Sequence, residues 1–186
     1  MRVLVMIDMQ NDFITGSLGS EAAQEVLRRV VRDIHEFADG KTPLFYTMDC
    51  HGTNYANSLE GKRLPVEHCR FESKGWELPP ELEEAIKVFA PAGIVPVGKS
   101  NFGSYWLPNE IEWLCEDRDV DWLSDELEIY IFGLCTDICV MANAITLRTF
   151  FKNAPITILT SWCAGTTQEN HELAIEAMKM LNIDAE

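Results

Sequence analysis

The sequence predicts an α/β fold: one three-layer, doubly wound domain over residues 1–186, with a central, mainly parallel sheet of five to six strands flanked by helices. Two observations support this prediction. Short runs of β-branched and other apolar residues alternate with amphipathic segments of about a dozen residues, as parallel βαβ crossovers require. The length of 186 residues suits one ordinary domain, and the chain shows no repeat, low-complexity tract or linker.

The first half of the chain supplies three strands and two helices. Residues 3–7 form a continuous apolar run, which is typical of a strand buried on both faces. Ser20 is placed to cap a helix, because apolar residues follow it at helical spacing as far as Gly40. The remaining elements predicted here are strands over residues 44–48 and 93–97 and a helix over residues 81–89, separated by a long irregular segment at residues 49–79.

The second half of the chain continues the same alternation. Helices are predicted over residues 108–115, 137–151 and 169–181, strands over residues 127–132 and 156–160, and a short last strand near Ile183. His171 stands near the start of the last helix, and we expect it to be a structural or surface residue.

Composition argues against several classes of partner. The 30 acidic and 15 basic side chains leave a net charge of -15, which disfavours a nucleic-acid ligand and an anionic membrane surface. The first apolar run is too short for a secretory signal, and no stretch reaches membrane-spanning length. We therefore expect a cytoplasmic protein whose six cysteines are free thiols.

Reactive side chains follow four of the predicted strands, at the edge of the sheet where doubly wound folds bind ligands. They are Asp8, the pair Asp49 and His51, Lys99, and Cys139. Cys139 begins a helix, where free N–H groups and a nearby Lys99 are expected to lower the pKa of its thiol. Asp8 is then placed to carry a proton to and from the reacting group. Taken singly, the three residues are equally compatible with a packing thiol, a turn aspartate and a surface lysine.

A second group of side chains suggests a metal site. Asp49 and His51 alternate on an extended backbone, so their side chains point the same way. Glu60 and His68 follow within the irregular segment. Carboxylates and imidazoles are good ligands for zinc or a similar divalent ion. A polar loop with ordinary surface histidines is the alternative.

Four motifs give the chain a family resemblance. They are VMIDMQNDF at residues 5–13, DCH at 49–51, GKSNF at 98–102 and GLCTDICV at 133–140. In sequence and order they resemble those of the isochorismatase-like cysteine hydrolases, and the resemblance runs over nearly the whole chain. It looks strongest for the nicotinamidase branch, whose members hydrolyse nicotinamide to nicotinic acid and ammonia.

The resemblance implies a mechanism and a cofactor. Cys139 would attack the amide carbonyl to form a thioester, Asp8 would move the proton, and Lys99 would hold both in their charged states. The oxyanion would lie on the backbone N–H groups of Cys135 and Cys139, beside a cis peptide between Leu134 and Cys135. A divalent metal ion, zinc in most relatives, would be held by Asp49, His51, Glu60 and His68.

The chain also departs from the nicotinamidase pattern. Asn57 stands where many nicotinamidases have a further histidine, and Glu60 is expected to replace that ligand. Leu64 stands near an aromatic position of many relatives, whereas Phe13 is retained, so we expect both in the substrate pocket. Another amidohydrolase, acting on a carbamoyl, ureido or maleamate-type amide, therefore stays open, as does a non-catalytic binding or redox module. Many relatives form dimers or tetramers, and a homo-oligomer is compatible with this sequence.

Overall fold

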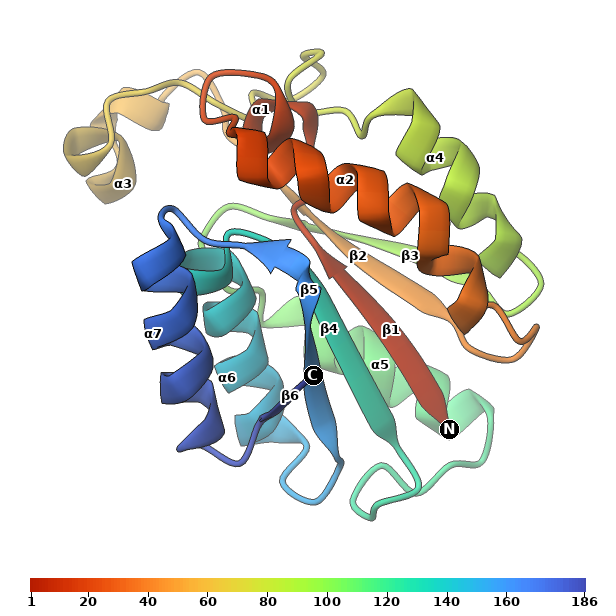
Figure 1. Cartoon of the computed structure of the whole chain (residues 1–186). Helices are drawn as coiled ribbons and strands as arrows, with labels where there is room; N and C mark the ends of the chain where they lie inside the picture. Colours follow the sequence, from red (N-terminus) through yellow and green to blue (C-terminus); the bar gives the residue numbers. More distant parts are fainter.

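Six parallel strands form the centre of the computed structural model, which describes residues 1–186 (Figure 1). They are β1 (Arg2–Ile7), β2 (Leu44–Asp49), β3 (Ile94–Lys99), β4 (Glu128–Leu134), β5 (Ile156–Ala164) and β6 (Asp184–Ala185). Their order in the sheet is β3-β2-β1-β4-β5-β6. This is the doubly wound order, in which ligands bind where the chain switches direction, between β1 and β4. The predicted fold class is confirmed, and every strand pair is parallel.

Helices cover both faces of the sheet. One face carries α2 (Glu21–Asp33) and α4 (Pro80–Ile86), and the other carries α5 (Trp106–Asp117), α6 (Met141–Phe150) and α7 (Gln168–Lys179) (Figure 1). Ser20 caps α2 as predicted, since its side-chain oxygen accepts the N–H of Ala23 at 3.1 Å. The α-helix ends earlier than predicted, at Asp33, and a 3₁₀ turn (Ile34–Phe37) continues it towards Gly40.

The segment predicted to be irregular contains short helices that the sequence pattern does not reveal. After a 3₁₀ turn (Tyr55–Asn57) comes α3 (Leu59–Arg63), which stands out from the body of the molecule in Figure 1. Ser58 caps α3 by accepting the N–H of Gly61 at 2.8 Å. Five residues are too few to show a helical period, which is why the element escapes prediction. A four-residue helix, α1 (Asn11–Ile14), follows β1 in the same way.

The core fixes the ends of the central strands. Val3 to Ile7 are fully buried in β1, as their continuous apolar run predicts, and each such side chain contributes about 1.5–3 kcal/mol. Gly133 lets the end of β4 approach β1 closely, because it has φ +132 and a Cβ there would lie 2.1 Å from the oxygen of Ile7. The two strand ends that carry the candidate chemistry are therefore held against each other.

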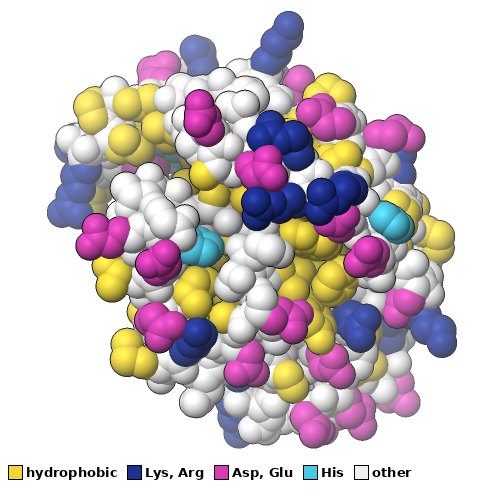
Figure 2. Space-filling view, in the orientation of Figure 1, with side chains coloured by type: hydrophobic (Ala, Val, Ile, Leu, Met, Phe, Trp, Pro, Cys, Tyr) yellow, Lys and Arg dark blue, Asp and Glu magenta, His cyan; other side chains and the backbone are white.

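The surface carries the negative charge that the composition predicts. Acidic side chains are scattered over the face shown in Figure 2, and basic ones are fewer. None of the helices combines the length and apolarity that a membrane span requires. All six cysteines are unpaired.

Candidate active site and metal cluster

Asp8 follows β1 and is completely buried. Its backbone leaves the strand with φ +47, and its N–H donates to the Thr47 hydroxyl oxygen at 3.1 Å. The same hydroxyl donates to Asp8 Oδ1 at 2.6 Å, while Oδ2 lies 2.6 Å from Lys99 Nζ. Burial raises the pKa of Asp8, and the charge of Lys99 opposes that rise. Each carboxylate oxygen thus has its own partner.

Lys99 connects the candidate catalytic groups. It ends β3 with its side chain buried, and Nζ lies 3.7 Å from Cys139 Sγ and 3.5 Å from Asp49 Oδ1. Burial works to lower the pKa of Lys99, but the charge of Asp8 and then those of Cys139 and Asp49 outweigh it and raise the pKa. Lys99 is therefore a permanent cation. The structure brings together Asp8, Lys99 and Cys139, as their strand-end positions predict.

The protonation state of Cys139 differs from the prediction. Burial, and next the charge of Asp8, raise the pKa of its thiol well above the usual value, against the opposing effect of Lys99. The expected resting thiolate is therefore wrong. The physical reason is that Lys99 is already paired with Asp8, so a second buried anion would lack a counter-charge. Asp8 Oδ2 and Cys139 Sγ both lie beside Lys99 Nζ, at 2.6 Å and 3.7 Å, which makes the Asp8 carboxylate a candidate acceptor of the thiol proton.

The turn between β4 and the next helix presents Cys139. A π-helical turn, η4 (Thr136–Val140), precedes α6, so the predicted helix over residues 137–151 is in two parts. The peptide between Leu134 and Cys135 is cis, as the resemblance implies. The buried amide of Asn143 holds the turn by donating to Cys139 O at 2.7 Å and to Phe102 O at 3.1 Å. Cys139 thereby lies at the cavity wall, with its Sγ beside Lys99 Nζ.

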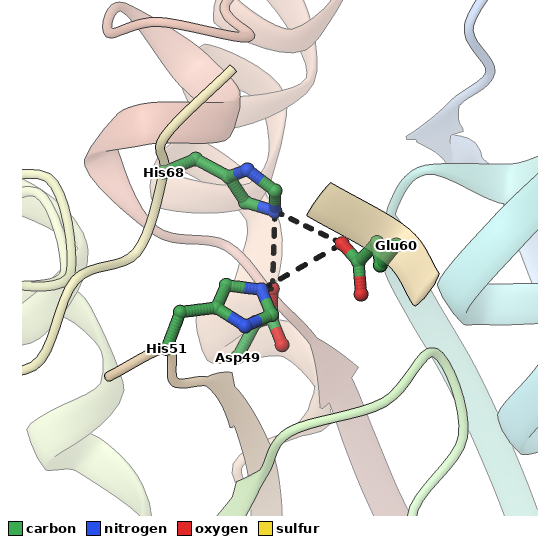
Figure 3. A group of neighbouring side chains, drawn as sticks. All are labelled: Asp49, His51, Glu60 and His68. Atoms are coloured by element: carbon green, nitrogen blue, oxygen red, sulfur yellow. Dashed lines mark ion pairs between the residues drawn. The ribbon is translucent and has the colours of Figure 1, made fainter. Parts of the chain in front are cut away.

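The four predicted metal ligands lie together. One ligand atom from each of Asp49, His51, Glu60 and His68 lies within 4.8 Å of the others. Figure 3 shows the side chains pointing towards a common centre, with Glu60 reaching in from α3. His51 Nε2 is 2.9 Å from Asp49 Oδ2, and His68 Nε2 is 3.4 Å from both Asp49 Oδ2 and Glu60 Oε1. The four come from a strand end, a short helix and two loops.

The chemistry of this cluster fits a divalent cation. His68 Nδ1 lies 2.8 Å from Val66 O, and because a carbonyl only accepts, that nitrogen carries the proton. Nε2 is turned towards the carboxylates of Asp49 and Glu60. Burial works to lower the pKa of His68, but hydrogen bonding to Asp49 and the two carboxylate charges outweigh it and raise that pKa. His51 Nε2 is buried without a hydrogen-bond partner. The four distances between a histidine nitrogen and a carboxylate oxygen run from 2.9 to 3.7 Å, and all four ligand atoms lie within 4.8 Å of one another. Ligand atoms of tetrahedral zinc lie about 3.3 Å apart.

Two supporting residues were not predicted. The buried amide of Gln10 donates to Asp49 O at 2.9 Å and Trp76 O at 2.8 Å, and it accepts the N–H of Asp49 at 2.7 Å. Tyr55 packs its ring 4.6 Å and 5.2 Å from the two histidine rings, and its hydroxyl donates to Leu64 O. The one sequence signal for Gln10 is its position two residues after Asp8.

A cavity of about 320 Å³ lies between the thiol and the metal cluster. Cys139 lines one part of it, and Asp49, Glu60 and His68 line another. Apolar side chains form much of the wall, and no lysine or arginine contributes to it; these apolar residues include the predicted Phe13 and Leu64 and the unpredicted Leu18, Phe102 and Ile138. This volume is at the small end for ligand pockets, which suits a small and largely apolar substrate.

Comparison with known proteins places the chain among hydrolases. The isochorismatase domain model matches residues 2–184. A nicotinamidase/pyrazinamidase of Mycobacterium tuberculosis is 25% identical over 191 residues, covering 99% of this chain and 97% of that protein. The nicotinamidase/pyrazinamidase structure from Bacillus subtilis has a TM-score of 0.80 at 24% identity, covering 99% and 98% of the two chains. The pyrazinamidase of Pyrococcus horikoshii, solved in complex with zinc, has a TM-score of 0.76 at 22% identity, covering 100% and 98%.

Proposed function

The chain belongs to the isochorismatase family, and from this premise we propose that it is a cysteine amidohydrolase that converts nicotinamide to nicotinic acid and ammonia. One observation carries the proposal. A single small cavity has the thiol of the Asp8, Lys99 and Cys139 group on one side and a cluster of potential metal ligands on the other. An amide substrate in this cavity can be held at one end and attacked at the other.

The first half of the reaction forms a tetrahedral intermediate on the thiol. Cys139 transfers its proton to Asp8, and its sulfur attacks the amide carbonyl carbon. Lys99 lies beside both groups, so the negative charge moves from the carboxylate to the sulfur without losing its counter-ion. We assign the resulting oxyanion to the backbone N–H groups of Cys135 and Cys139, where each such donor supplies about 3 kcal/mol.

The second half releases the products. Asp8 gives its proton to the departing nitrogen, the C–N bond breaks, and ammonia leaves a thioester on Cys139. Asp8 then takes a proton from water, which attacks the thioester carbonyl. The acid departs and the sulfur recovers its proton from Asp8. Asp8 therefore accepts and donates the proton in every step, and Thr47 and Lys99 hold its carboxylate in place.

We propose zinc as the ion held by Asp49, His51, Glu60 and His68, since the Pyrococcus horikoshii relative was solved with zinc. When bound, the ion supplies a Lewis-acid contact for a ring nitrogen of the substrate. The ring of Phe13 lies 5.5 Å from that of His68 and offers an apolar face to a flat heterocycle beside the cluster. A cytoplasmic location belongs to the same proposal, because six unpaired cysteines need a reducing compartment.

The charge of the cavity favours an uncharged substrate. Its lining includes Asp49 and Glu60 but no lysine or arginine. A maleamate-type substrate would place its own carboxylate in this wall without a basic partner, which is unfavourable in a buried site. A second candidate, an amidase for carbamoyl or ureido compounds, is favoured by Leu64, an aliphatic residue in the cavity wall.

The test is ammonia release by the purified, zinc-loaded protein. We expect kcat/KM for nicotinamide to exceed that for maleamate by at least about 100-fold, because the cavity wall has no lysine or arginine to pair with the maleamate carboxylate, and a buried charge without such a partner costs about 3 kcal/mol. Cys139→Ala should remove turnover, and Asp8→Asn should remove it while leaving zinc content unchanged. Absence of ammonia at millimolar nicotinamide would contradict the proposal, and release from an N-carbamoyl compound instead would favour the second candidate.

A further inference from the structure

Three chain segments meet behind the turn that carries the nucleophile. The buried Thr136 places its hydroxyl oxygen 2.8 Å from Nδ1 of His171, on α7. Next to it, the Asp137 carboxylate accepts the N–H of Thr166 at 2.8 Å and its hydroxyl at 2.5 Å. Gly165 lies between these groups, and a Cβ there would be 2.9 Å from both Asp137 Oδ1 and His171 Cβ. The segments are in close contact.

These contacts hold a short stretch of backbone that is neither strand nor regular α-helix. We call residues 135–139 the oxyanion turn, because its first and last residues supply the proposed N–H donors. Pairing of β4 with β5 ends at Leu134 and Ala164, just before the turn. Backbone hydrogen bonds run from the N–H groups of Ile138 and Val140 to the carbonyl of Cys135, and from the N–H of Met141 to the carbonyls of Thr136 and Ile138. The side-chain contacts add support from neighbouring segments.

Oxyanion stabilisation depends strongly on that position. Backbone donors are effective when they lie about 2.7–3.1 Å from the oxygen that becomes charged in the transition state. A displacement of about 1 Å can lower the rate about 100-fold. Thr136 follows the first proposed donor directly, so a shift of its side chain moves that donor. His171 does not line the cavity, so it is not placed to contact a substrate bound there.

We propose that His171 is a positioning residue, which holds the oxyanion turn through its hydrogen bond with Thr136. This inference rests on the proposed function. It goes beyond the expectation that His171 is a structural or surface residue. His171 affects the two backbone N–H donors only through Thr136, without contacting the substrate. The hydrogen bonds between Asp137 and Thr166 support the same turn from the loop that follows β5.

The test uses variants that remove or keep this one hydrogen bond. His171→Leu and Thr136→Val remove it. His171→Asn keeps a polar atom near the position of Nδ1, and Thr136→Ser keeps the hydroxyl. His35→Leu is the matched control, because His35 is an exposed histidine on the 3₁₀ turn that follows α2. Thermal unfolding of each variant shows whether it is folded at the assay temperature.

Three reactions of the zinc-loaded protein distinguish an effect on the oxyanion turn from an effect on the reactivity of the thiol. Nicotinamide hydrolysis and acylation by p-nitrophenyl acetate both pass through an oxyanion; the ester forms a thioester on Cys139 and releases p-nitrophenolate. Alkylation by iodoacetamide forms an S–C bond and expels iodide without an oxyanion. A Cys139→Ala protein gives the background for all three reactions.

We expect His171→Leu to lower kcat and the acylation rate by about 10- to 100-fold, with KM and the alkylation rate changed less than about twofold. His171→Asn and Thr136→Ser should recover most of the loss. The double variant His171→Leu/Thr136→Val should be no slower than the worse single variant, because both remove the same contact.

Several results would overturn the inference. They are equal losses of acylation and alkylation, a rise in KM alone, an equal effect of His35→Leu, and ester acylation of the native protein that does not depend on Cys139. The proposed substrate can fail separately. If the native protein releases no ammonia from nicotinamide, yet His171→Leu slows acylation and spares alkylation, the role of His171 is supported and the substrate is wrong.

Discussion

The two oxygens of Asp8 are held by different groups. Thr47 donates a hydrogen bond to Oδ1 and Lys99 Nζ forms an ion pair with Oδ2, each at 2.6 Å, and all three residues are buried. A hydroxyl has one proton to donate, so while Asp8 is ionised Thr47 gives that proton to Oδ1 and accepts from the Asp8 N–H. The carboxylate is therefore fixed in rotation, with one oxygen directed towards the lysine.

Replacing Thr47 tests this arrangement. Thr47→Val removes a hydrogen bond that lowers the pKa of Asp8, so that pKa should rise and the carboxyl should stay protonated to a higher pH. A protonated Asp8 cannot accept the Cys139 proton. We therefore expect kcat/KM to fall about 10-fold and the acidic limb of its pH profile to move to higher pH. Thr47→Ser should resemble the native enzyme, and superimposable profiles for Thr47→Val and the native protein would exclude the role.

At the scale of elements, α3 links the long loop to the metal cluster. This five-residue helix carries Glu60 towards the two histidines, and Leu64, the residue after it, lines the cavity. Of the remaining ligands, Asp49 ends β2, and Gln10 holds its backbone through two hydrogen bonds. His51 and His68 lie 2.9 Å and 3.4 Å from the Asp49 carboxylate. A short capped helix thus supplies one of the four candidate ligands.

A substitution on α3 should weaken metal binding. Glu60→Gln removes an anionic oxygen from the cluster, and we expect zinc affinity to fall at least about 10-fold. Competition with a chromogenic chelator measures this without reference to activity. Glu67→Gln is the matched control, because it makes the same change on an exposed residue next to His68. Equal affinities of the two variants would show that Glu60 is not a ligand.

The whole molecule buries most of its cysteines, and this couples stability to pH. Burial raises the pKa of Cys115 to about 11 and that of Cys163 to about 12. The folded protein therefore keeps thiol protons that the unfolded chain releases above about pH 8.5. The contribution of these protonated thiols to the free energy of unfolding is complete below that pH. It is lost as the pH rises towards the pKa values of the thiols in the folded protein.

This coupling predicts alkaline destabilisation. Each such thiol should lower the free energy of unfolding by about 1.4 kcal/mol per pH unit between its unfolded and folded pKa values. Urea denaturation at pH 8 and pH 10, with reductant present, measures the loss. Cys163→Ala should be less stable at pH 8, because it leaves a cavity, but should lose less on going to pH 10. Equal slopes for the variant and the native protein would contradict the coupling.

The sequence by itself determined the order of the elements and the edge of the sheet at which chemistry gathers. Apolar runs alternating with amphipathic segments require parallel crossovers, and in a parallel sheet all the C-terminal strand ends share one edge. Asp8, Asp49, Lys99 and Cys139 each stand at or just after such an end, so their convergence follows from local pattern alone. The metal ligands were found by their chemical type.

Only the tertiary structure decided the contacts between distant segments. The hydrogen-bond partners of Asp8, Gln10 and Thr136 lie between 35 and 66 residues away, where no periodicity connects them. The protonation of Cys139 was predicted wrongly because it depends on desolvation and on how Lys99 shares its charge with Asp8. Burial and charge sharing are properties of the packed molecule, since they arise only when separate segments exclude water together.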